Sequence, residues 1–388
     1  MSTEKKTPRS TGTMRTAACA LAVMISVSLL AGCADSSSSD NTSKAETSLS
    51  TSVTTVTEAP AVSSQSETVT TTTSETVTTT VTETVSEPEV VKEPESSLEF
   101  AKKCCSSNNY EYLGTLENGD KMQKVYDALK EVCLDAWEHT DRDYDDAETN
   151  SHDEICIKIF DEGEFGLGPR DLALAGAMFE RDNPIFYFAM PTVCAPITEN
   201  GEQIYLSVAI GDDFLKGSFR AEIQKAIQEK VTAISETASA GKSTYERERL
   251  AYDGVAQAVE YAYDEDGEEL QNGLTSTAAG VYNGELICEG YAKLYKTVLD
   301  YMDLPCWFVE GKEIEHAWNI IGIDGKYYYA DATWDDAYAE TTYNYFAKGS
   351  QVFNEDHCTD IPEPFKYMNG LPKVEEDNYI GQHRATIP

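Results

Sequence analysis

Apolar residues recur at regular spacing only beyond about residue 99. Between 119 and 139, large apolar side chains return every three or four positions, which predicts an amphipathic helix. Further helices and strands are predicted by the same reasoning over Asp171–Arg181, Phe219–Thr237 and Thr244–Ala262 (helices) and over 155–160 and 185–190 (strands). We therefore expect residues 99–240 to form a mixed α/β region.

A turn signal separates two more β-prone runs. Asp324-Gly325 lies between residues 317–323 and 326–333, and this dipeptide is typical of a two-residue hairpin turn in which both residues have positive φ. The pattern predicts an antiparallel hairpin. Its register requires an even loop, because a one-residue bulge would turn the side chains of one strand to the other face.

The predicted hairpin brings a histidine close to an aspartate. A two-residue loop places Trp318 opposite Asp331 and His316 opposite Thr333, so His316 and Asp331 are diagonal neighbours on one face. A histidine can accept and return a proton near neutral pH, and a carboxylate can hold its tautomer and orientation. The alternative interpretation of His316 is a core histidine that only packs.

A cysteine precedes the last long predicted helix. Asn283-Gly284 indicates a turn, and apolar residues from Tyr291 onward mark one helical face until Pro305 ends the run. Cys288 therefore lies at or just before a helix N-terminus, where unpaired N–H groups and the helix dipole favour the nucleophilic thiolate. Most buried free cysteines only pack, so this position alone assigns no role.

Charge restricts the possible partners. The 388 residues include 68 Asp or Glu and 30 Lys or Arg, which gives a formal net charge of −38 and a pI near 4.3. We expect no nucleic-acid partner, because the chain has no excess of basic side chains to neutralise phosphates. The acidity is concentrated beyond residue 98, which indicates a soluble, self-repelling surface more often than a site for a basic substrate.

The first 33 residues have the pattern of an export signal. A basic stretch ends at Arg15, and an apolar stretch too short to span a bilayer follows it. Leu30-Ala31-Gly32-Cys33 resembles the lipobox of bacterial lipoproteins, which implies that Cys33 is lipidated and begins the mature chain. An ordinary secretory signal is the alternative. We expect an extracytoplasmic protein with a lipid anchor on the bacterial cell membrane.

Residues 34–98 have the composition of a tether. About half of them are Ser or Thr, and a degenerate repeat is visible at Ser66–Val69, Ser74–Val77 and Thr82–Val85. Such a segment cannot bury enough apolar surface to offset the entropy lost on ordering, so we expect it to be disordered. It would act as a spacer between the membrane and a globular part.

The ten cysteines leave the redox chemistry open. With Cys19 removed in the signal, Cys33 lipidated and Cys288 a free nucleophile, an odd number remains, so at least one more is unpaired or intermolecular. An exported location permits disulfides but does not assign them. No zinc-type spacing and no calcium loop is recognisable, so we expect no metal and no cofactor; a metal held by Cys288, His316 and Asp331 is the alternative.

Three segments in order resemble a known family. Cys288–Ala292, His316–Asn319 and Asp331–Asp335 have the order and spacing of the transglutaminase-like core of bacterial exported proteins, and the resemblance covers about residues 250–357. Asp182–Tyr187, Tyr345-Phe346 and Asp356-His357 resemble segments that flank such cores. The resemblance implies an α+β, papain-like fold over 241–388, in which a helix bearing the cysteine packs against an antiparallel sheet.

The resemblance also implies a mechanism. Cys288 would attack a carboxamide or peptide carbonyl, His316 would carry the proton and Asp331 would orient His316, with a thioester acyl-enzyme as the intermediate. The implied substrate is protein or cell-wall peptide, and hydrolysis by a cysteine peptidase or amidase is favoured over cross-linking. A catalytically silent binding module for wall or surface partners is the alternative.

Aromatic residues near the three segments are candidates for the pocket. The backbone N–H of Cys288 is one expected oxyanion donor. Tyr282 is a weaker candidate for the second donor, with a packing role as its alternative. Trp318 and Trp334 flank the proposed site as pocket walls or core residues, and Asp335 is expected to cap a turn.

Overall fold

Four long helices begin and end close to where the apolar spacing predicts. In the computed structural model they are α3 (Gly119–Glu138), α5 (Pro169–Asp182), α6 (Gly217–Ala238) and α7 (Thr244–Ala258). The helix expected to reach Ala262 ends earlier, because the chain enters β6 (Glu260–Tyr261), which runs parallel to β7 (Glu285–Leu286). The structure describes residues 95–144, 156–161, 166–194, 197–198, 201–202, 205–311, 315–336, 341–357 and 370–379.

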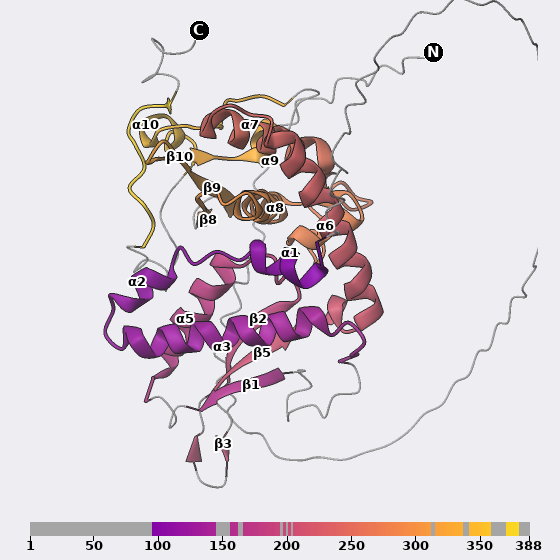
Figure 1. The fold of residues 1–388 in the computed structure, drawn as a ribbon, viewed down its shortest axis with the longest axis vertical. Coiled ribbons are helices and arrows are strands. Elements are labelled where there is room, and N and C mark those ends of the chain that lie inside the picture. The colour runs from indigo at the N-terminus through magenta and orange to yellow at the C-terminus, as the bar shows by residue number, and fades with distance from the viewer. Residues whose placement is uncertain are drawn as a thin grey trace, which may run out of the picture. The chain divides into compact units, whose positions relative to one another are not determined.

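The N-terminal part contains a three-stranded antiparallel sheet. Its strands are β1 (Cys156–Asp161), β5 (Tyr205–Ile210) and β2 (Ala189–Cys194), in that spatial order, and α5 packs against β2 and β5 (Figure 1). The strand predicted over 185–190 is wrong in position. Residues 185–188 are buried but lie in turns before β2, so their apolar run reflects burial and not strand geometry.

Several short elements complete the described fold. They are α1 (Ser97–Lys103), α2 (Tyr110–Gly114), β3 (Ile197–Thr198), β4 (Gly201–Glu202), η1 (Asp212–Phe214), η2 (Ala278–Tyr282), α9 (Ala332–Asp335) and α10 (Ser350–Phe353). Strands β3 and β4 pair only with each other. The fold is therefore a mixed α/β arrangement with small sheets.

The predicted hairpin is present with the predicted turn. Strands β9 (His316–Ile323) and β10 (Lys326–Ala330) pair antiparallel, and Asp324 and Gly325 have φ of 53° and 76°. Positive φ at both positions is the geometry of a type I′ turn. The second strand ends at Ala330 and not at Thr333, because the chain turns into α9 there.

Helix α8 (Cys288–Tyr301) lies against this second sheet. The sheet order is β10-β9-β8, with β8 (Cys306–Gly311) at one edge, and helices α6 and α7 also pack on α8 (Figure 1). The side-chain amide of Asn319 on β9 donates to the carbonyl of Ala292 on α8 at 3.0 Å. This bond fixes the start of the helix relative to the strand that begins with His316.

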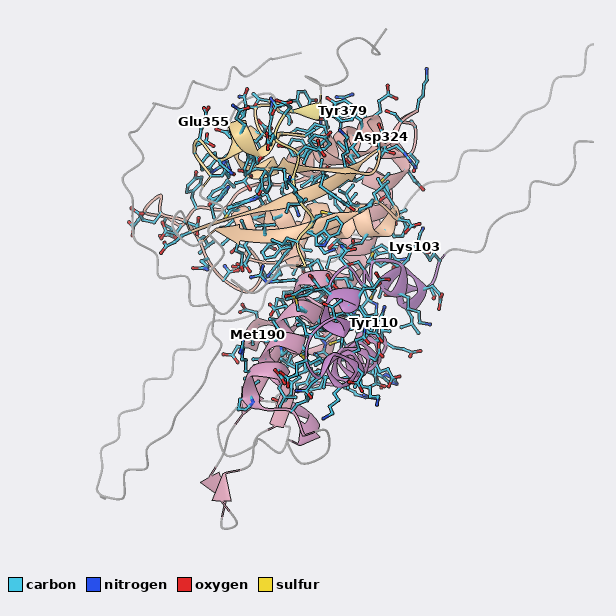
Figure 2. The ribbon with its side chains drawn as sticks, turned by 90° about the vertical axis from the view of Figure 1, so that its left-hand side faces the viewer. Lys103, Tyr110, Met190, Asp324, Glu355 and Tyr379 are labelled. Carbon is cyan, nitrogen blue, oxygen red and sulfur yellow. The ribbon has the colours of Figure 1, made fainter. Side chains whose placement is uncertain are left out.

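The C-terminal segment covers the free edge of β10. The backbone of Tyr329 exchanges hydrogen bonds with that of Lys348, at 2.9 and 3.0 Å. At the far end of the hairpin, the hydroxyl of Tyr379 donates to Asp324 at 2.9 Å, and Figure 2 shows the two side chains close together. The β9–β10 hairpin is thus held on its outer side by residues distant in the sequence.

A buried ammonium joins the N-terminal part to α8. Lys296 is fully buried and donates to both carboxylate oxygens of Asp300 (3.0 and 2.9 Å) and to the hydroxyl of Ser106 (3.0 Å). Ser106 in turn donates to the carbonyl of Asp182 at 2.8 Å. Burial raises the pKa of Asp300 to about 7, although Lys296 acts to lower it. The two parts predicted as 99–240 and 241–388 share one apolar core around this network.

The export signal with Cys33 and residues 34–94 of the expected tether lie outside the described residues. The predicted end of the tether at 98 is wrong, because Ser97 and Leu98 form the start of α1, which Ser96 caps. Among the helices that the structure describes, none is long and apolar enough to cross a membrane. The anchor and the tether therefore stay predictions.

We predict that Lys296→Met destabilises the fold by about 3–5 kcal/mol, because it leaves the buried Asp300 carboxylate without its partner. Without Lys296, the pKa of Asp300 rises further above its unfolded value. The loss should therefore grow as the pH rises, being larger at pH 8 than at pH 6. Urea unfolding at both pH values measures it.

Lys102→Met is the matched control for this change. The Lys102–Glu99 pair joins two exposed side chains at 2.8 Å, so its loss should cost less than about 1 kcal/mol at either pH. Equal effects of the two substitutions, or no dependence of the Lys296→Met effect on pH, would contradict the role assigned to the buried network.

Candidate active site

Cys288 is the first residue of α8, as the sequence predicts. The residue is 6% exposed, and its thiol is not part of a disulfide. The preceding residue is Ile287, which supplies no side-chain cap, so the first N–H groups of the helix have no capping side chain. At Gly290, an added Cβ would lie 2.3 Å from the carbonyl oxygen of Thr275. The helix start therefore approaches neighbouring backbone more closely than any larger residue would allow.

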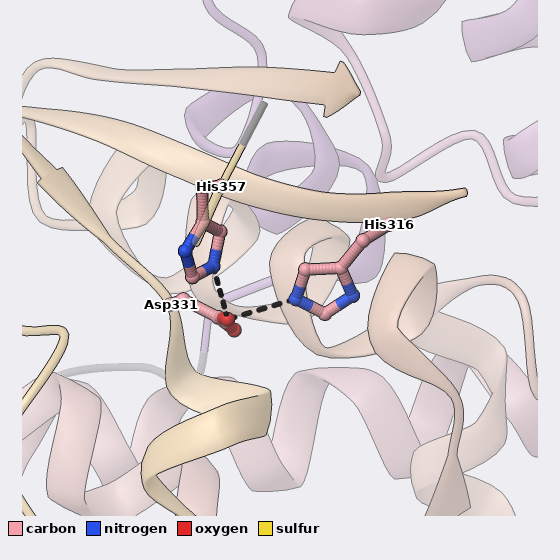
Figure 3. A group of neighbouring side chains, drawn as sticks. All are labelled: His316, Asp331 and His357. Carbon is pink, nitrogen blue, oxygen red and sulfur yellow. Dashed lines mark hydrogen bonds and ion pairs between the residues drawn. The ribbon is translucent and has the colours of Figure 1, made fainter. Parts of the chain in front are cut away.

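His316 and Asp331 meet as the hairpin register predicts. Nε2 of His316 lies 2.8 Å from Oδ2 of Asp331, and both side chains are buried (Figure 3). An ionised carboxylate only accepts hydrogen bonds, so Nε2 carries the proton in this contact. Nδ1 is then the ring nitrogen left to accept a proton from a nucleophile.

Asp331 is held by backbone as well as by side chains. Its Oδ1 caps α9 by accepting from the N–H groups of Thr333 (2.9 Å) and Trp334 (3.3 Å). Burial acts to raise the pKa of Asp331, but His316 and His357 lower it more, so that the pKa lies well below its ordinary value. The carboxylate is therefore ionised and oriented at neutral pH.

Asp335 organises the turn that follows α9. It is fully buried and accepts from the hydroxyls of Tyr252 (2.6 Å) and Thr342 (2.5 Å) and from the backbone of Asn344 (2.8 Å). Tyr252 also donates to the carbonyl of Asp331. The expected capping role of Asp335 is confirmed, and its contacts support the position of Asp331.

A second histidine reaches the same carboxylate. His357, with 0% of its surface exposed, places Nε2 at 3.0 Å from Oδ2 of Asp331 and Nδ1 at 2.8 Å from Oδ1 of Asp356. The sequence assigns no chemistry to His357, because it follows α10 and comes to Asp331 only through tertiary packing. The one local signal is the Asp356-His357 dipeptide in a chain with five histidines.

Among the described residues, His316, Asp331 and His357 form a group whose side chains are close enough together to hold a metal ion. One ligand atom from each lies within 4.8 Å of the others. However, both imidazole nitrogens already point at the same carboxylate oxygen at hydrogen-bond distance, and Oδ1 is taken by backbone N–H groups. We interpret the group as a hydrogen-bonded cluster.

Cys288 and His316 line one small pocket. Its other lining residues include four carboxylates, those of Glu269, Glu289, Glu310 and Glu315. Lys293 pairs with Glu289 at 2.6 Å, and Arg181 from α5 pairs with Glu310. The N-terminal part of the chain thus contacts a residue of the pocket wall without lining the pocket itself.

The helix start, which favours the thiolate, is not the dominant influence on the thiol of Cys288. Burial raises the pKa of the thiol well above its ordinary value, and the charge of Glu269 raises it further, whereas a backbone hydrogen bond from Ala317 lowers it. The helix start supplies only a local effect, which desolvation and nearby acids outweigh. The nucleophile must therefore lose its proton to a base during the reaction.

The aromatic candidates divide into two groups. Tyr282 is wrong as an oxyanion donor, because its hydroxyl donates to Glu222 at 2.8 Å, its ring packs edge-on against Phe219, and it is absent from the pocket lining. Trp334 stacks on His316 with ring centroids 5.0 Å apart, and Trp318 is a fully buried core residue with its centroid 6.0 Å from that ring. These two tryptophans hold the histidine and do not line the pocket.

Comparison with known proteins gives one distant relative in sequence. No family model matches the chain. Over 150 residues, which is 33% of this chain, it is 25% identical to the Kyphoscoliosis peptidase of Mus musculus. That alignment covers 22% of the mouse protein, so the chain spans about a fifth of the length of the curated relative it matches.

The solved structures that partly match this fold include a TGase and candidate proteases. They include a TGase (16% identity, TM-score 0.28, covering 56% of this chain and 60% of that one) and a candidate cysteine protease from Cytophaga hutchinsonii (12%, 0.23, covering 37% and 62%). A candidate protease from Parabacteroides distasonis overlaps at 10% identity and a TM-score of 0.21, covering 36% of this chain and 35% of that one. Scores this low do not carry an assignment of activity.

We predict that alkylation of Cys288 by iodoacetamide is slow at pH 7 and accelerates without levelling off up to pH 9, because the pKa of the thiol is raised above its ordinary value of about 8.5. Glu269→Gln removes a nearby negative charge, lowers this pKa and should speed alkylation several-fold at pH 8. Mass spectrometry of the peptide containing Cys288 measures the rate separately from the other thiols.

Glu268→Gln provides the control, since Glu268 is the exposed neighbour of Glu269 and does not line the pocket. It should leave the rate unchanged. A rate that reaches its plateau below pH 8 in the unmodified protein, or equal rates in Glu269→Gln and Glu268→Gln, would contradict the raised pKa and its cause.

Proposed function

We propose that this protein is a transglutaminase-like thiol enzyme that acts on peptide or carboxamide bonds. The observation that carries the proposal is the His316–Asp331 hydrogen bond of 2.8 Å beside a pocket that His316 shares with Cys288 at a helix start. Nucleophile, base and orienting carboxylate are the three parts that covalent acyl transfer by a thiol requires. The distant sequence match to a peptidase agrees with this class of enzyme.

In the first step the thiol proton moves to Nδ1 of His316 as Sγ of Cys288 attacks the carbonyl carbon. Asp331 holds Nε2–H and stabilises the imidazolium that forms. The proton then passes to the leaving amine, the C–N bond breaks, and a thioester remains on Cys288. In hydrolysis, water attacks the thioester carbonyl while His316 accepts a proton of that water. The C–S bond then breaks, the carboxylic acid leaves, and His316 returns the proton to Sγ of Cys288.

The start of α8 is the proposed oxyanion site. The N–H of Cys288 lies at a helix end without a capping side chain, where backbone donors and the dipole favour a developing negative charge. We assign only this donor, since Tyr282 is bonded elsewhere. The carboxylates around the pocket are separate from this donor. We expect their negative charge to influence which substrates enter the pocket.

We further propose hydrolysis over amine transfer, with protein or cell-wall peptide as the substrate outside the cytoplasm. The lipobox-like segment ending at Cys33 and the Ser/Thr-rich 34–98 support an enzyme held on the bacterial cell membrane by a lipid and a spacer. The spacer would let the catalytic part reach substrates at a distance from the bilayer.

A catalytically silent binding module is the second candidate. The observation that favours it is the burial of Cys288 together with the raised pKa of its thiol. In that case the pocket would bind surface partners, and Cys288 would be a packing residue. The two candidates differ in whether turnover depends on Cys288.

For the enzyme we predict that Cys288→Ala and His316→Gln each lower turnover by about 10³-fold or more, and that Asp331→Asn does so too, because the amide can present the wrong partner to Nε2. Turnover is measured by mass spectrometry of peptides released from a cell-wall digest and a protein digest, with and without added dansylcadaverine.

Peptides that appear equally with and without the amine indicate hydrolysis, and dansyl-tagged products indicate transfer. Tyr282→Phe is the control and should keep full activity. Undiminished turnover in Cys288→Ala would refute the thiol mechanism, and binding of digest peptides without any turnover would favour the silent module.

For the location we predict that Cys33→Ala moves the protein from the membrane fraction of bacterial cells to the soluble fraction, and abolishes its labelling by an alkyne-tagged palmitate. Cys19→Ala is the control and should change neither readout. Membrane retention and labelling that persist in Cys33→Ala would contradict the lipid anchor.

A further inference from the structure

Asp331 serves two histidines through one oxygen. Nε2 of His316 and Nε2 of His357 lie 2.8 and 3.0 Å from Oδ2, and Figure 3 shows both rings directed at this oxygen. A triad needs only the first of these contacts. The second belongs to a fully buried ring from a separate segment of the chain.

Both nitrogens of His357 face carboxylates. Nε2 meets Asp331, and Nδ1 meets Oδ1 of Asp356 at 2.8 Å. A neutral imidazole has one N–H and one lone pair, so either tautomer would point a lone pair at a carboxylate oxygen. Only the imidazolium donates at both nitrogens. The two hydrogen bonds therefore select the charged form of the ring.

The surroundings of His357 also suit a cation. Four aromatic rings surround it, with centroids 3.8 to 5.3 Å away, and we call them the aromatic box: Phe353, Trp334, Tyr345 and Trp318. Aromatic faces within about 6 Å attract a cation, most strongly where water is excluded. Tyr345 also donates to Oδ2 of Asp356 at 2.7 Å, which leaves Oδ1 for the imidazolium.

We propose that His357 is a positioning residue that donates from both ring nitrogens, holds Asp331 in place and balances its charge. This inference rests on the proposed function. With His357 charged, Oδ2 of Asp331 is held by a second donor besides His316, and one unit of its charge is compensated. His316 then faces a carboxylate that orients it but does not hold it permanently as a cation, so that His316 can accept the thiol proton.

The charged and titratable groups near His357 are few, and each enters this balance. Asp331 and His316 lie on one side, and Asp356 with the hydroxyl of Tyr345 lies on the other. Asp356 is half-exposed, with 44% of its side chain accessible, so its charge is partly screened by solvent. Asp331 is the buried partner, and it feels the His357 charge most strongly.

The charge itself is tested by ¹⁵N NMR of the full chain labelled at histidine. One ring should show the imidazolium pattern at both nitrogens at pH 7, and that pattern should be absent in His357→Gln. His139→Gln, which removes a surface histidine bonded to the carbonyl of Asp135, should leave it unchanged. A ring assigned to His357 that is neutral at pH 7 would overturn the proposal, whether or not the protein is an enzyme.

The positioning role is tested by the pH profile of kcat/KM in the digest assay. His357→Gln keeps a donor for Asp331 but removes the charge, so kcat/KM should fall at least tenfold and the limb that reflects protonation of His316 should move to higher pH. His357→Lys restores a cation and should move that limb back toward its original position. An unshifted limb in a folded His357→Gln protein would overturn the role.

Two further readouts separate the possible failures. If no turnover depends on Cys288, the proposed function fails, and the ¹⁵N pattern of His357 still decides whether its ring donates at both nitrogens. If instead the purified protein carries a stoichiometric transition metal that is lost in His357→Gln, the cluster is a metal site, and the proposal is wrong. Thermal unfolding of each variant confirms that the comparison is made on folded protein.

Discussion

The carboxylate of Asp331 is the interaction on which the candidate active site depends. It is 1% exposed and accepts four N–H groups, two from imidazole rings and two from the first turn of α9. These four bonds use all the acceptor sites of an ionised carboxylate, which is why burial does not neutralise it. The orientation of His316 follows directly from this arrangement.

The rest of the fold brings a cysteine to that histidine. Asn319 ties β9 to the carbonyl of Ala292 on α8, so the strand that begins with His316 and the helix that begins with Cys288 keep a constant relation. Lys296, one helical turn or more further along α8, bonds to Ser106 and to Asp300 and links the helix to the N-terminal part. The N-terminal extension is thus part of what supports the pocket, and through Arg181 it also reaches the pocket wall.

Features set by local sequence could be predicted, and features set by tertiary packing could not. The Asp324-Gly325 turn has positive φ at both residues and so determines the hairpin register that unites His316 with Asp331. Residues 185–188 are apolar because they are buried in turns, so their apolar run wrongly predicted a strand over 185–190. The sequence indicates a helix start at Cys288 that favours the thiolate, whereas the burial and the charge of Glu269 that outweigh this effect depend on the whole fold.

The proposed mechanism requires that Cys288 forms a thioester with its substrate. The most direct measurement is acid quenching of the protein during incubation with the cell-wall and protein digests, followed by mass spectrometry of the peptide that contains Cys288. We expect an acyl adduct on Cys288 that hydroxylamine removes. In His316→Gln, much less of this adduct should accumulate than in the unmodified protein. Turnover without any adduct on Cys288, and equal turnover in Cys288→Ala, would contradict this mechanism.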